Sequence, residues 1–233
     1  MTSLARLAWP DVASITDRGA VLLVPVGSTE QHGPHLPVTT DTDIAVAIVS
    51  HPAIGIRLPH AVIAPAIPYG SCGEHDGFPG TLSIGQTATE LVLVELVRSA
   101  SAAFAAVVVV STHGGNSQPV ERAMALLGSE GRNVRTWSPR WQGDAHAGHT
   151  ETSLMLAIAP DRVRLESAAP GDTRPLASIL PELRAGGVGS VSPNGVLGDP
   201  TTASPDEGKR LLTAAVDDLV GFVDSSDVTG SQL

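Results

Sequence analysis

Three short and strongly apolar runs constrain the fold of this chain more than any other feature. They are AVLLVPV between Gly19 and Gly27, AVIAPAI at residues 61–67 and AVVVVS at residues 106–111. Short apolar runs of this kind are typical of buried strands, and Pro65 counts against a central position for the second. Longer stretches of helical character separate the runs, as in strands joined by helical crossovers. We therefore expect an α/β fold of three layers, α/β/α, with a largely parallel central sheet.

The stretches between and after these runs supply the expected helices. Asp41 or Asp43 is a candidate N-cap for the apolar-periodic stretch TDIAVAIVSH. A further strand is expected at VRTW, residues 134–137, whereas long Gly/Pro-rich loops are expected to be functional. Helices are expected at 86–104, at 117–131 with its end at Gly131, and at 207–223; the long loops are 68–81, 138–148 and 186–205.

Size and composition indicate one enzyme-sized domain. The chain has 233 residues, 42% of them hydrophobic, and no linker or repeat divides it. We expect a single domain over residues 1–233 with a frayed tail at about 225–233. A formal charge of -10 argues against nucleic-acid and membrane-surface partners. One cysteine, the absence of an apolar leader region and the absence of a membrane-length apolar segment favour a cytoplasmic protein.

The segment VGSTEQHGPHLPVTTDTD, residues 26–43, concentrates potential metal ligands directly after the first apolar run. It contains Glu30, His32, His35, Asp41 and Asp43, although only 16% of the chain is charged and it has 8 histidines. Carboxylate and imidazole groups hold borderline divalent cations. The segment STHGGN likewise puts His113 directly after the AVVVVS strand. Because open α/β sheets bind ligands at the carboxyl ends of their strands, a metal site is expected there.

Several of these residues also have purely structural interpretations. Asp41 and Asp43 can serve as helix caps, and Asp43 is expected to be structural. His35 is expected to contact backbone rather than metal, and the glycines of HGGN are often only a turn. Trp137, Trp141 and Phe78 can wall a pocket or fill the core, and the sequence leaves both roles open.

Five ordered segments resemble the signature segments of the creatinine amidohydrolase (creatininase) family. They are PVGSTEQHGPHLPVTTDTD, YGSCGEHDGFPGT, STHGGN, HAGHTETS and GVLGDPTTA, between about residues 20 and 215. The resemblance implies two divalent metal ions per chain, of zinc, iron or manganese. It further implies that Asp41 bridges them, that Glu30 and His113 complete one site, and that His32 belongs to the other.

The chain departs from creatininase itself after the metal histidine. Creatininase has a tyrosine and a ligating glutamate there, whereas this chain has Gly114 and Gly115. We expect Glu151 of HAGHTETS to replace the lost ligand, with His149 as the alternative, because a carboxylate keeps the compensating charge. By alignment with a creatininase histidine near the substrate, His146 is the expected general acid.

The expected activity is metal-dependent amide hydrolysis, in which a hydroxide bridging the metals attacks the amide carbonyl and His146 and Glu151 take part in catalysis. Within the family, these motifs in so short a chain are similar to those of a peptidase that matures a ribosomally made redox-cofactor precursor. The expected reaction is release of a modified C-terminal dipeptide. Hydrolysis of a small cyclic amide or formamide is the alternative, and a metal-stabilised binding module without turnover is the alternative of another class. Family analogy also implies a homo-oligomer, since creatininase forms a ring-like hexamer. The residues expected to contact substrate are Gly114, Gly115, Asn116, Glu74 and His75.

Overall fold

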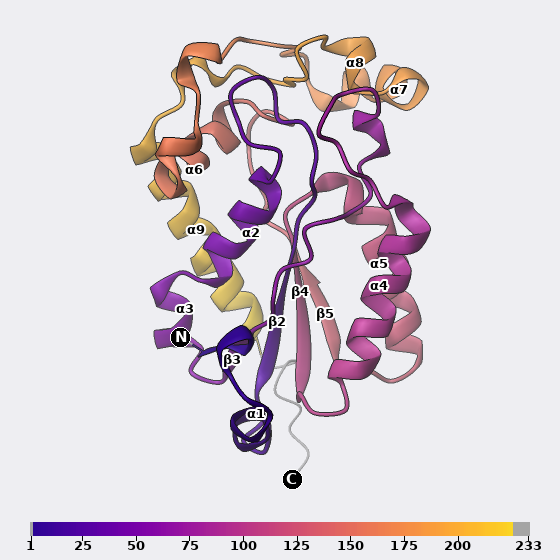
Figure 1. Cartoon of the computed structure of the whole chain (residues 1–233), viewed down its shortest axis with the longest axis vertical. Helices are drawn as coiled ribbons and strands as arrows, with labels where there is room; N and C mark the ends of the chain where they lie inside the picture. The colour runs from indigo at the N-terminus through magenta and orange to yellow at the C-terminus, as the bar shows by residue number, and fades with distance from the viewer. Residues whose placement is uncertain (1, 226–233) are drawn as a thin grey trace.

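The computed structural model describes residues 2–225 and has a five-stranded parallel sheet between two layers of helices (Figure 1). The expected three-layer α/β/α architecture is confirmed. The spatial order of the strands is β1-β3-β2-β4-β5, and every neighbouring pair is parallel. The strands are β1 Thr2–Ser3, β2 Val21–Val26, β3 Ala61–Ile63, β4 Ala106–Ser111 and β5 Val134–Trp137.

Helices cover both faces of the sheet, and a separate helical arm lies beyond the carboxyl ends of the strands (Figure 1). One hydrophobic cluster packs the sheet against α4 and α5, and a second packs it against α2, α3, α6 and α9. The arm consists of α7 and α8, which have their own small cluster. The helices are α1 Trp9–Thr16, α2 Thr40–Val49, α3 Pro52–Arg57, α4 Gly85–Ala100, α5 Ser117–Ser129, α6 His149–Ile158, α7 Leu176–Gly186, α8 Val188–Val191 and α9 Pro205–Asp224. Short 3-10 helices are η1 Leu4–Arg6, η2 Gly73–His75, η3 Gly114–Asn116, η4 Pro160–Arg162, η5 Leu165–Ser167 and η6 Pro200–Thr202.

The paired central strands β2 and β4 fix the position of the site. All six residues of each strand are buried, and they pair in register from Val21 with Ala106 to Val26 with Ser111. Their carboxyl ends therefore lie side by side. The segments that leave these two ends carry most of the residues singled out in the sequence.

The strand expected at residues 61–67 is shorter than predicted. It ends at Ile63, and only an isolated bridge between Val26 and Ile67 continues the pairing. Pro65 has no backbone N–H to donate to a ladder, which explains the early end. On its other side β3 meets only the two-residue strand β1.

The helix expected after Asp41 or Asp43 begins earlier than predicted. Helix α2 starts at Thr40, its N-cap is Thr39, and no side chain caps it, so neither aspartate is the N-cap. Helices α1, α3, α6 and α7 were not predicted, and α8 and η6 occupy part of the expected loop 186–205. The predicted frayed tail falls almost entirely on residues 226–233, which lie outside the described residues.

Candidate metal centre

Buried carboxylates and histidines from four segments converge above the ends of β2 and β4. Glu30 and His32 lie in the segment after β2, and Asp41 lies in the first turn of α2. His113 follows β4 by two residues, and Glu151 lies in the first turn of α6. The structure thus brings together all five residues that the sequence nominated as metal ligands.

The distances define two groups that share Asp41. His32 Nε2 lies 3.3 Å from Asp41 Oδ1 and 3.8 Å from Glu151 Oε2. On the other side, His113 Nδ1 lies 3.3 Å from Asp41 Oδ2, and His113 Nε2 lies 3.2 Å from Glu30 Oε2. Potential ligand atoms within each group, His32–Asp41–Glu151 and Glu30–Asp41–His113, lie within 4.8 Å of one another. Both groups therefore contain Asp41, and each has the carboxylate and imidazole donors that suit a divalent cation.

The histidines are oriented to present one ring nitrogen to this cluster. His32 Nδ1 lies 3.1 Å from the Glu30 carbonyl, and His113 Nε2 lies 2.9 Å from the Ser71 carbonyl. A carbonyl oxygen can only accept a hydrogen bond, so the ring nitrogen that faces it carries the proton. The second nitrogen of the same ring is then free to coordinate a metal. Hydrogen bonds of this kind orient metal-binding histidines and fix their tautomers.

The burial of unsatisfied polar atoms tests whether the cluster fits a metal. Both carboxylate oxygens of Glu30, His32 Nε2 and Asp41 Oδ2 are buried without a partner in hydrogen-bonding geometry. Leaving such groups unsatisfied costs about 1–3 kcal/mol each, and more when they are charged. Divalent cations bound by these atoms would remove that cost, so the donor set fits metal binding.

The carboxylates and histidines of the cluster shift one another's pKa values, in addition to the effect of burial. Burial opposes charge on His32, but the carboxylates of Asp41 and Glu151 outweigh it and raise its pKa to about 10. Burial likewise opposes charge on His113, whose pKa is nevertheless raised because Glu30 and Asp41 adjoin it. Burial raises the pKa of Glu30, and that of Glu151 to about 7. The pKa of Asp41 is lowered, because His32 and His113 outweigh the effect of its burial.

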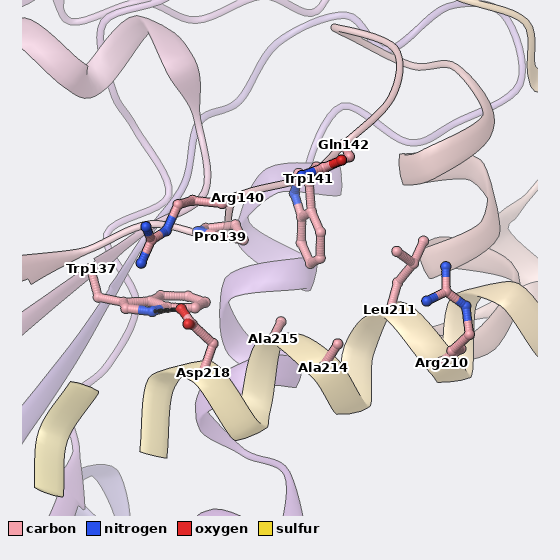
Figure 2. A pocket seen from close by; sticks show the side chains of 10 residues that line it. All are labelled: Trp137, Pro139, Arg140, Trp141, Gln142, Arg210, Leu211, Ala214, Ala215 and Asp218. Atoms are coloured by element: carbon pink, nitrogen blue, oxygen red, sulfur yellow. Dashed lines mark hydrogen bonds between the residues drawn. The ribbon is translucent and has the colours of Figure 1, made fainter. Parts of the chain in front are cut away.

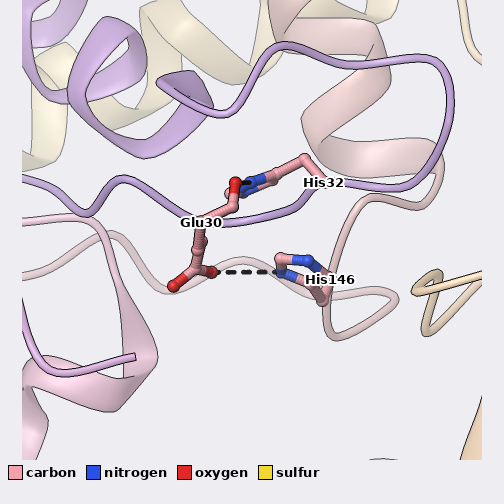
Figure 3. Close-up of side chains that lie close together, drawn as sticks. All are labelled: Glu30, His32 and His146. Atoms are coloured by element: carbon pink, nitrogen blue, oxygen red, sulfur yellow. Dashed lines mark hydrogen bonds and ion pairs between the residues drawn. The ribbon is translucent and has the colours of Figure 1, made fainter. Parts of the chain in front are cut away.

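His146 lies against the same cluster (Figure 3). Its Nδ1 is 3.6 Å from Glu30 Oε1, and its Nε2 is 2.8 Å from the Gln31 carbonyl. The Nε2 atom therefore carries the proton of the neutral ring, and Nδ1 faces Glu30. Burial, together with the neighbouring His32 and His75, holds the pKa of His146 well below its ordinary value. Glu30, His32 and His146 form a third group of potential metal ligands.

Gln31, between the two predicted ligands, is a residue that the sequence analysis missed. Its Nε2 lies 2.8 Å from His75 Nδ1, 3.1 Å from His146 Nε2 and 2.9 Å from the Gly195 carbonyl. Because His146 Nε2 is itself the donor to the Gln31 carbonyl, the two amide hydrogens of Gln31 go to His75 Nδ1 and the Gly195 carbonyl, and they tie those two loops to the segment after β2. The place of Gln31 in the E-Q-H triplet was the only signal in the sequence, since none of its partners is nearby in the chain.

The predicted substrate-contacting residues separate into two groups. Glu74, His75, Gly114 and Gly115 border a cavity, and His75 Nε2 also lies 3.3 Å from Glu30 Oε1. Asn116 does not fit its prediction: it is fully buried, and its amide binds the Ser71 N–H and the Gly27 carbonyl. The Asn116 amide therefore links the segments that contain Ser71 and Gly27.

Gly115 borders the cavity as Gly114 does, but it has no room for a side chain. A Cβ at Gly115 would lie 2.3 Å from the Ser71 carbonyl oxygen and 2.4 Å from both Glu74 Oε1 and His113 Nε2. Close approach to the cluster therefore requires glycine here. A Cβ at Gly114 would meet nothing within 4 Å, so only Gly114 leaves open space.

Two cavities flank the cluster and share part of their lining. One, of about 430 Å³, reaches from Glu30, His113 and His146 toward the arm of α7 and α8. The other, of about 770 Å³, extends past Asp41 and Glu151 toward the segment 138–145. Their shared lining residues are His113, Gly114, Ser117, Ala145, His146 and Leu176.

A further cavity of about 440 Å³ lies between segment 137–142 and α9, and none of the five predicted metal ligands lines it (Figure 2). Trp137 is buried there, and its Nε1 donates to Asp218 Oδ2 at 2.7 Å, so Trp137 has a structural role. Trp141 borders both this cavity and the larger one at the cluster. Phe78 packs against the small core of the arm.

The other predicted structural residues lie at the margins of the cluster. Asp43 binds Arg162 Nη1 at 2.8 Å, in keeping with a structural role. His35 is buried; its Nε2 lies 2.9 Å from Thr152 Oγ1, and the ring also interacts with the Ala147 backbone, in keeping with the expected backbone contact. The alternative ligand His149 lies 3.0 Å from Thr202 Oγ1 through its Nδ1 and is in none of the ligand groups found among the described residues.

A parallel α/β sheet that carries a buried carboxylate and imidazole cluster beside open cavities defines a divalent-metal enzyme. Comparison with known proteins makes the class specific. The chain belongs to the creatininase family, whose model, described as creatinine amidohydrolase, matches residues 5–223. It is a metal-dependent amide hydrolase that acts on C–N bonds.

Individual relatives agree with this assignment. The mycofactocin precursor peptide peptidase of Mycolicibacterium smegmatis is 51% identical over 201 residues, which are 84% of this chain and 81% of that protein. A creatininase with one tryptophan-to-alanine substitution has a TM-score of 0.81 at 23% identity and covers 97% of this chain and 98% of its own. A creatininase of Zn-Zn type has a TM-score of 0.76 at 23% identity, and the match covers 95% of this chain and 96% of that protein. Across residues 2–225, no helix is both long and apolar enough to cross a bilayer.

Proposed function

We propose that this protein is a peptidase that releases the modified C-terminal dipeptide from the mycofactocin precursor peptide. The name of the relative that is 51% identical supports this substrate. The structural observation that carries the proposal is the pair of cavities that meet beside His113 and Gly114. Space on both sides of the cluster suits an extended peptide, with the short C-terminal fragment on one side of the cleaved bond and the longer part of the chain on the other.

The proposed centre holds two divalent cations of zinc, iron or manganese. Asp41 contributes to both, Glu30 and His113 complete one site, and His32 and Glu151 complete the other. Such a cation pair supplies an acidified water and charge stabilisation for the amide oxygen. The Zn-Zn type of a structural relative supports a pair of metals, and the mixed carboxylate and imidazole donors suit all three elements.

His146 is the proposed proton carrier. In its neutral form Nε2 donates to the Gln31 carbonyl, which leaves Nδ1 free on the side of Glu30 and the cavity. Nδ1 can take the proton that the attacking water loses and return it to the departing amine nitrogen. The carbonyl carbon gains the hydroxyl group, the C–N bond breaks, and the amine leaves neutral. This order of events agrees with the depressed pKa of the resting imidazole, which holds no proton at Nδ1 beforehand.

The proposal includes a cytoplasmic location and a homo-oligomer, hexameric by family analogy. Light scattering on the purified, metal-loaded protein measures the subunit number. A monomer at micromolar concentration would contradict that part of the proposal.

The test of function compares cleavage of the modified precursor peptide by two aspartate variants. Mass spectrometry should detect the released dipeptide with the metal-loaded protein. Asp41→Ala should lose both metals and all turnover, because Asp41 faces His32 and His113 at once. Asp43→Ala is the matched control, since Asp43 lies in the same helical turn but binds Arg162 instead. Creatinine hydrolysis without peptide cleavage would transfer the assignment to small cyclic amides, and full metal content in Asp41→Ala would refute the ligand set.

A further inference from the structure

We infer that the arm of α7 and α8 forms a specificity pocket for an apolar, uncharged group in the fragment released from the substrate. The inference rests on the proposed peptidase function and concerns the smaller of the two cavities at the cluster. Its wall toward the arm consists of hydrocarbon side chains: Leu176, Leu180, Leu183, Val188 and Leu197.

The cavity has two chemically different sides. Glu30, His113 and His146 border it at the cluster, where the amide bond is cut. Leu176, Leu180 and Leu183 border it on the arm, and their spacing of four and three residues puts them on one face of α7. A substrate group that extends from the scissile bond into this cavity therefore leaves a polar environment for an apolar one. Arg184 also borders the cavity but is exposed, so its charge remains hydrated.

The sizes of the two cavities indicate which part of the substrate enters each. Pockets for small molecules measure about 300–1,000 Å³, and 430 Å³ is near the lower limit of that range. Such a volume suits a fragment of one or two residues. The cavity of about 770 Å³ on the other side suits the longer part of a precursor chain.

The pocket wall is built on a packed support rather than on a loose loop. Ile179, Val188 and Leu197 are buried together, and Phe78 and Leu183 pack against them. Gly187, at φ 69°, joins the two helices, and a Cβ there would lie 2.8 Å from the Glu74 carbonyl oxygen. The wall therefore touches the same turn, η2, that supplies Glu74 and His75 to the cavity. By contrast, Leu180 lies outside this packed cluster and is only half-buried, which leaves it available to a ligand.

The experiment replaces Leu180 and varies the substrate. Two precursor peptides are compared, one with leucine and one with asparagine directly after the scissile bond. We expect the wild-type protein to prefer the leucine peptide by roughly tenfold or more in kcat/KM, the scale of discrimination by hydrophobic pockets. Leu180→Gln should lower kcat/KM for the leucine peptide roughly tenfold and leave the asparagine peptide within about twofold. Leu180→Met should restore the preference.

The matched control is Leu165→Gln, because Leu165 is 49% exposed and does not line the cavity. It should leave both peptides unchanged. Thermal melting checks that each variant is folded, and Leu176→Gln, on the same face of α7 and 45% exposed, replaces Leu180→Gln if the latter unfolds. Equal kcat/KM values of the wild-type protein for the two peptides would overturn the inference. An equal loss of kcat/KM for both peptides in Leu180→Gln would overturn it as well.

A binding measurement separates failure of this inference from failure of the proposed function. Calorimetry compares leucyl-phenylalaninamide with seryl-asparaginamide as ligands of the metal-loaded protein. Failure of the wild type to cleave the modified precursor peptide would refute the peptidase assignment, yet tighter binding of the apolar dipeptide that Leu180→Gln abolishes would still support the pocket. Binding of both dipeptides with equal affinity would refute the pocket whatever the rates.

Discussion

Metal binding by this protein should release protons, because the metal-free cluster holds them where the cations are expected. His32 has a pKa of about 10, and the pKa of His113 is also raised above its ordinary value. Both imidazoles must lose a proton before they coordinate a metal. At pH 7, removing a proton from a group with a pKa of 10 costs about 4 kcal/mol, since each pKa unit corresponds to about 1.4 kcal/mol. That cost reduces the apparent metal affinity at neutral pH.

The sign of the pH dependence follows from the direction of these shifts. Because the histidine pKa values lie above neutral pH, raising the pH removes the competing protons and strengthens metal binding. We expect the logarithm of the apparent binding constant to rise with pH above pH 7 by about one unit per pH unit from His32, with a further rise from His113. Below pH 7 the slope should steepen, because Glu151, with a pKa of about 7, then binds a proton as well.

Calorimetric titration of the metal-free protein with ZnCl₂ measures this release. In buffers with different ionisation enthalpies, the observed heat at pH 8 should vary with a slope that corresponds to at least the one proton of His32. His32→Gln should lower this number by about one, whereas Asp43→Asn should leave it unchanged because Asp43 binds Arg162. Heat that does not depend on the buffer, or an affinity that does not depend on pH, would refute the proposed competition between protons and metal.

Three further outcomes test other parts of the site. Gly115→Ala should destabilise the protein and weaken metal binding, because the added Cβ would overlap the Ser71 carbonyl and His113. Gly114→Ala should be tolerated. Equal melting temperatures and equal metal contents of the two variants would contradict this prediction. Glu151→Gln should weaken binding of the metal held with His32 and leave the metal held with Glu30 and His113 largely bound, as judged by metal analysis. Retention of both metals, or loss of both, would show a different ligand set. Burial lowers the pKa of His35 to about 4, so the unfolded chain binds a proton that the folded chain excludes, and stability should fall as the pH decreases from about 6.5 to 4. In urea titrations His35→Gln should show a shallower fall, and an unchanged pH dependence would exclude this contribution.

The sequence predicted the structure best in segments where every residue meets the same physical requirement, such as burial. Strands β2 and β4 are buried on both faces, so their uninterrupted apolar runs were diagnostic. The predicted ligands converge because parallel strands end at the same edge of the sheet. Helix α6 escaped prediction because its residues 150 and 152–156 are all buried, which removes the amphipathic pattern, and α7 contains Pro181.

Contacts between distant segments could not be inferred from the sequence. The amide of Gln31 joins His75 and Gly195, and the space beside Gly115 is filled by Ser71. Such facts depend on distances of a few ångströms between loops, which sequence spacing does not determine. The same limit explains why Asn116 was taken for a substrate contact, although its amide is occupied by backbone groups.

The convergence of the cluster residues has a consequence for the assembly of the chain. Glu30 and Glu151 come from opposite ends of the sheet-forming region, and α6, which carries Glu151, packs extensively against the C-terminal helix α9. A bound cation pair would act as a cross-link that closes this long loop, in the manner of a disulfide but reversible by chelation. A growing chain that ends before α6 has four of the five ligands but cannot close the loop. Only the proposed site of His32, Asp41 and Glu151 needs α6 in place, because the residues of the other proposed site, Glu30, Asp41 and His113, all come earlier in the chain.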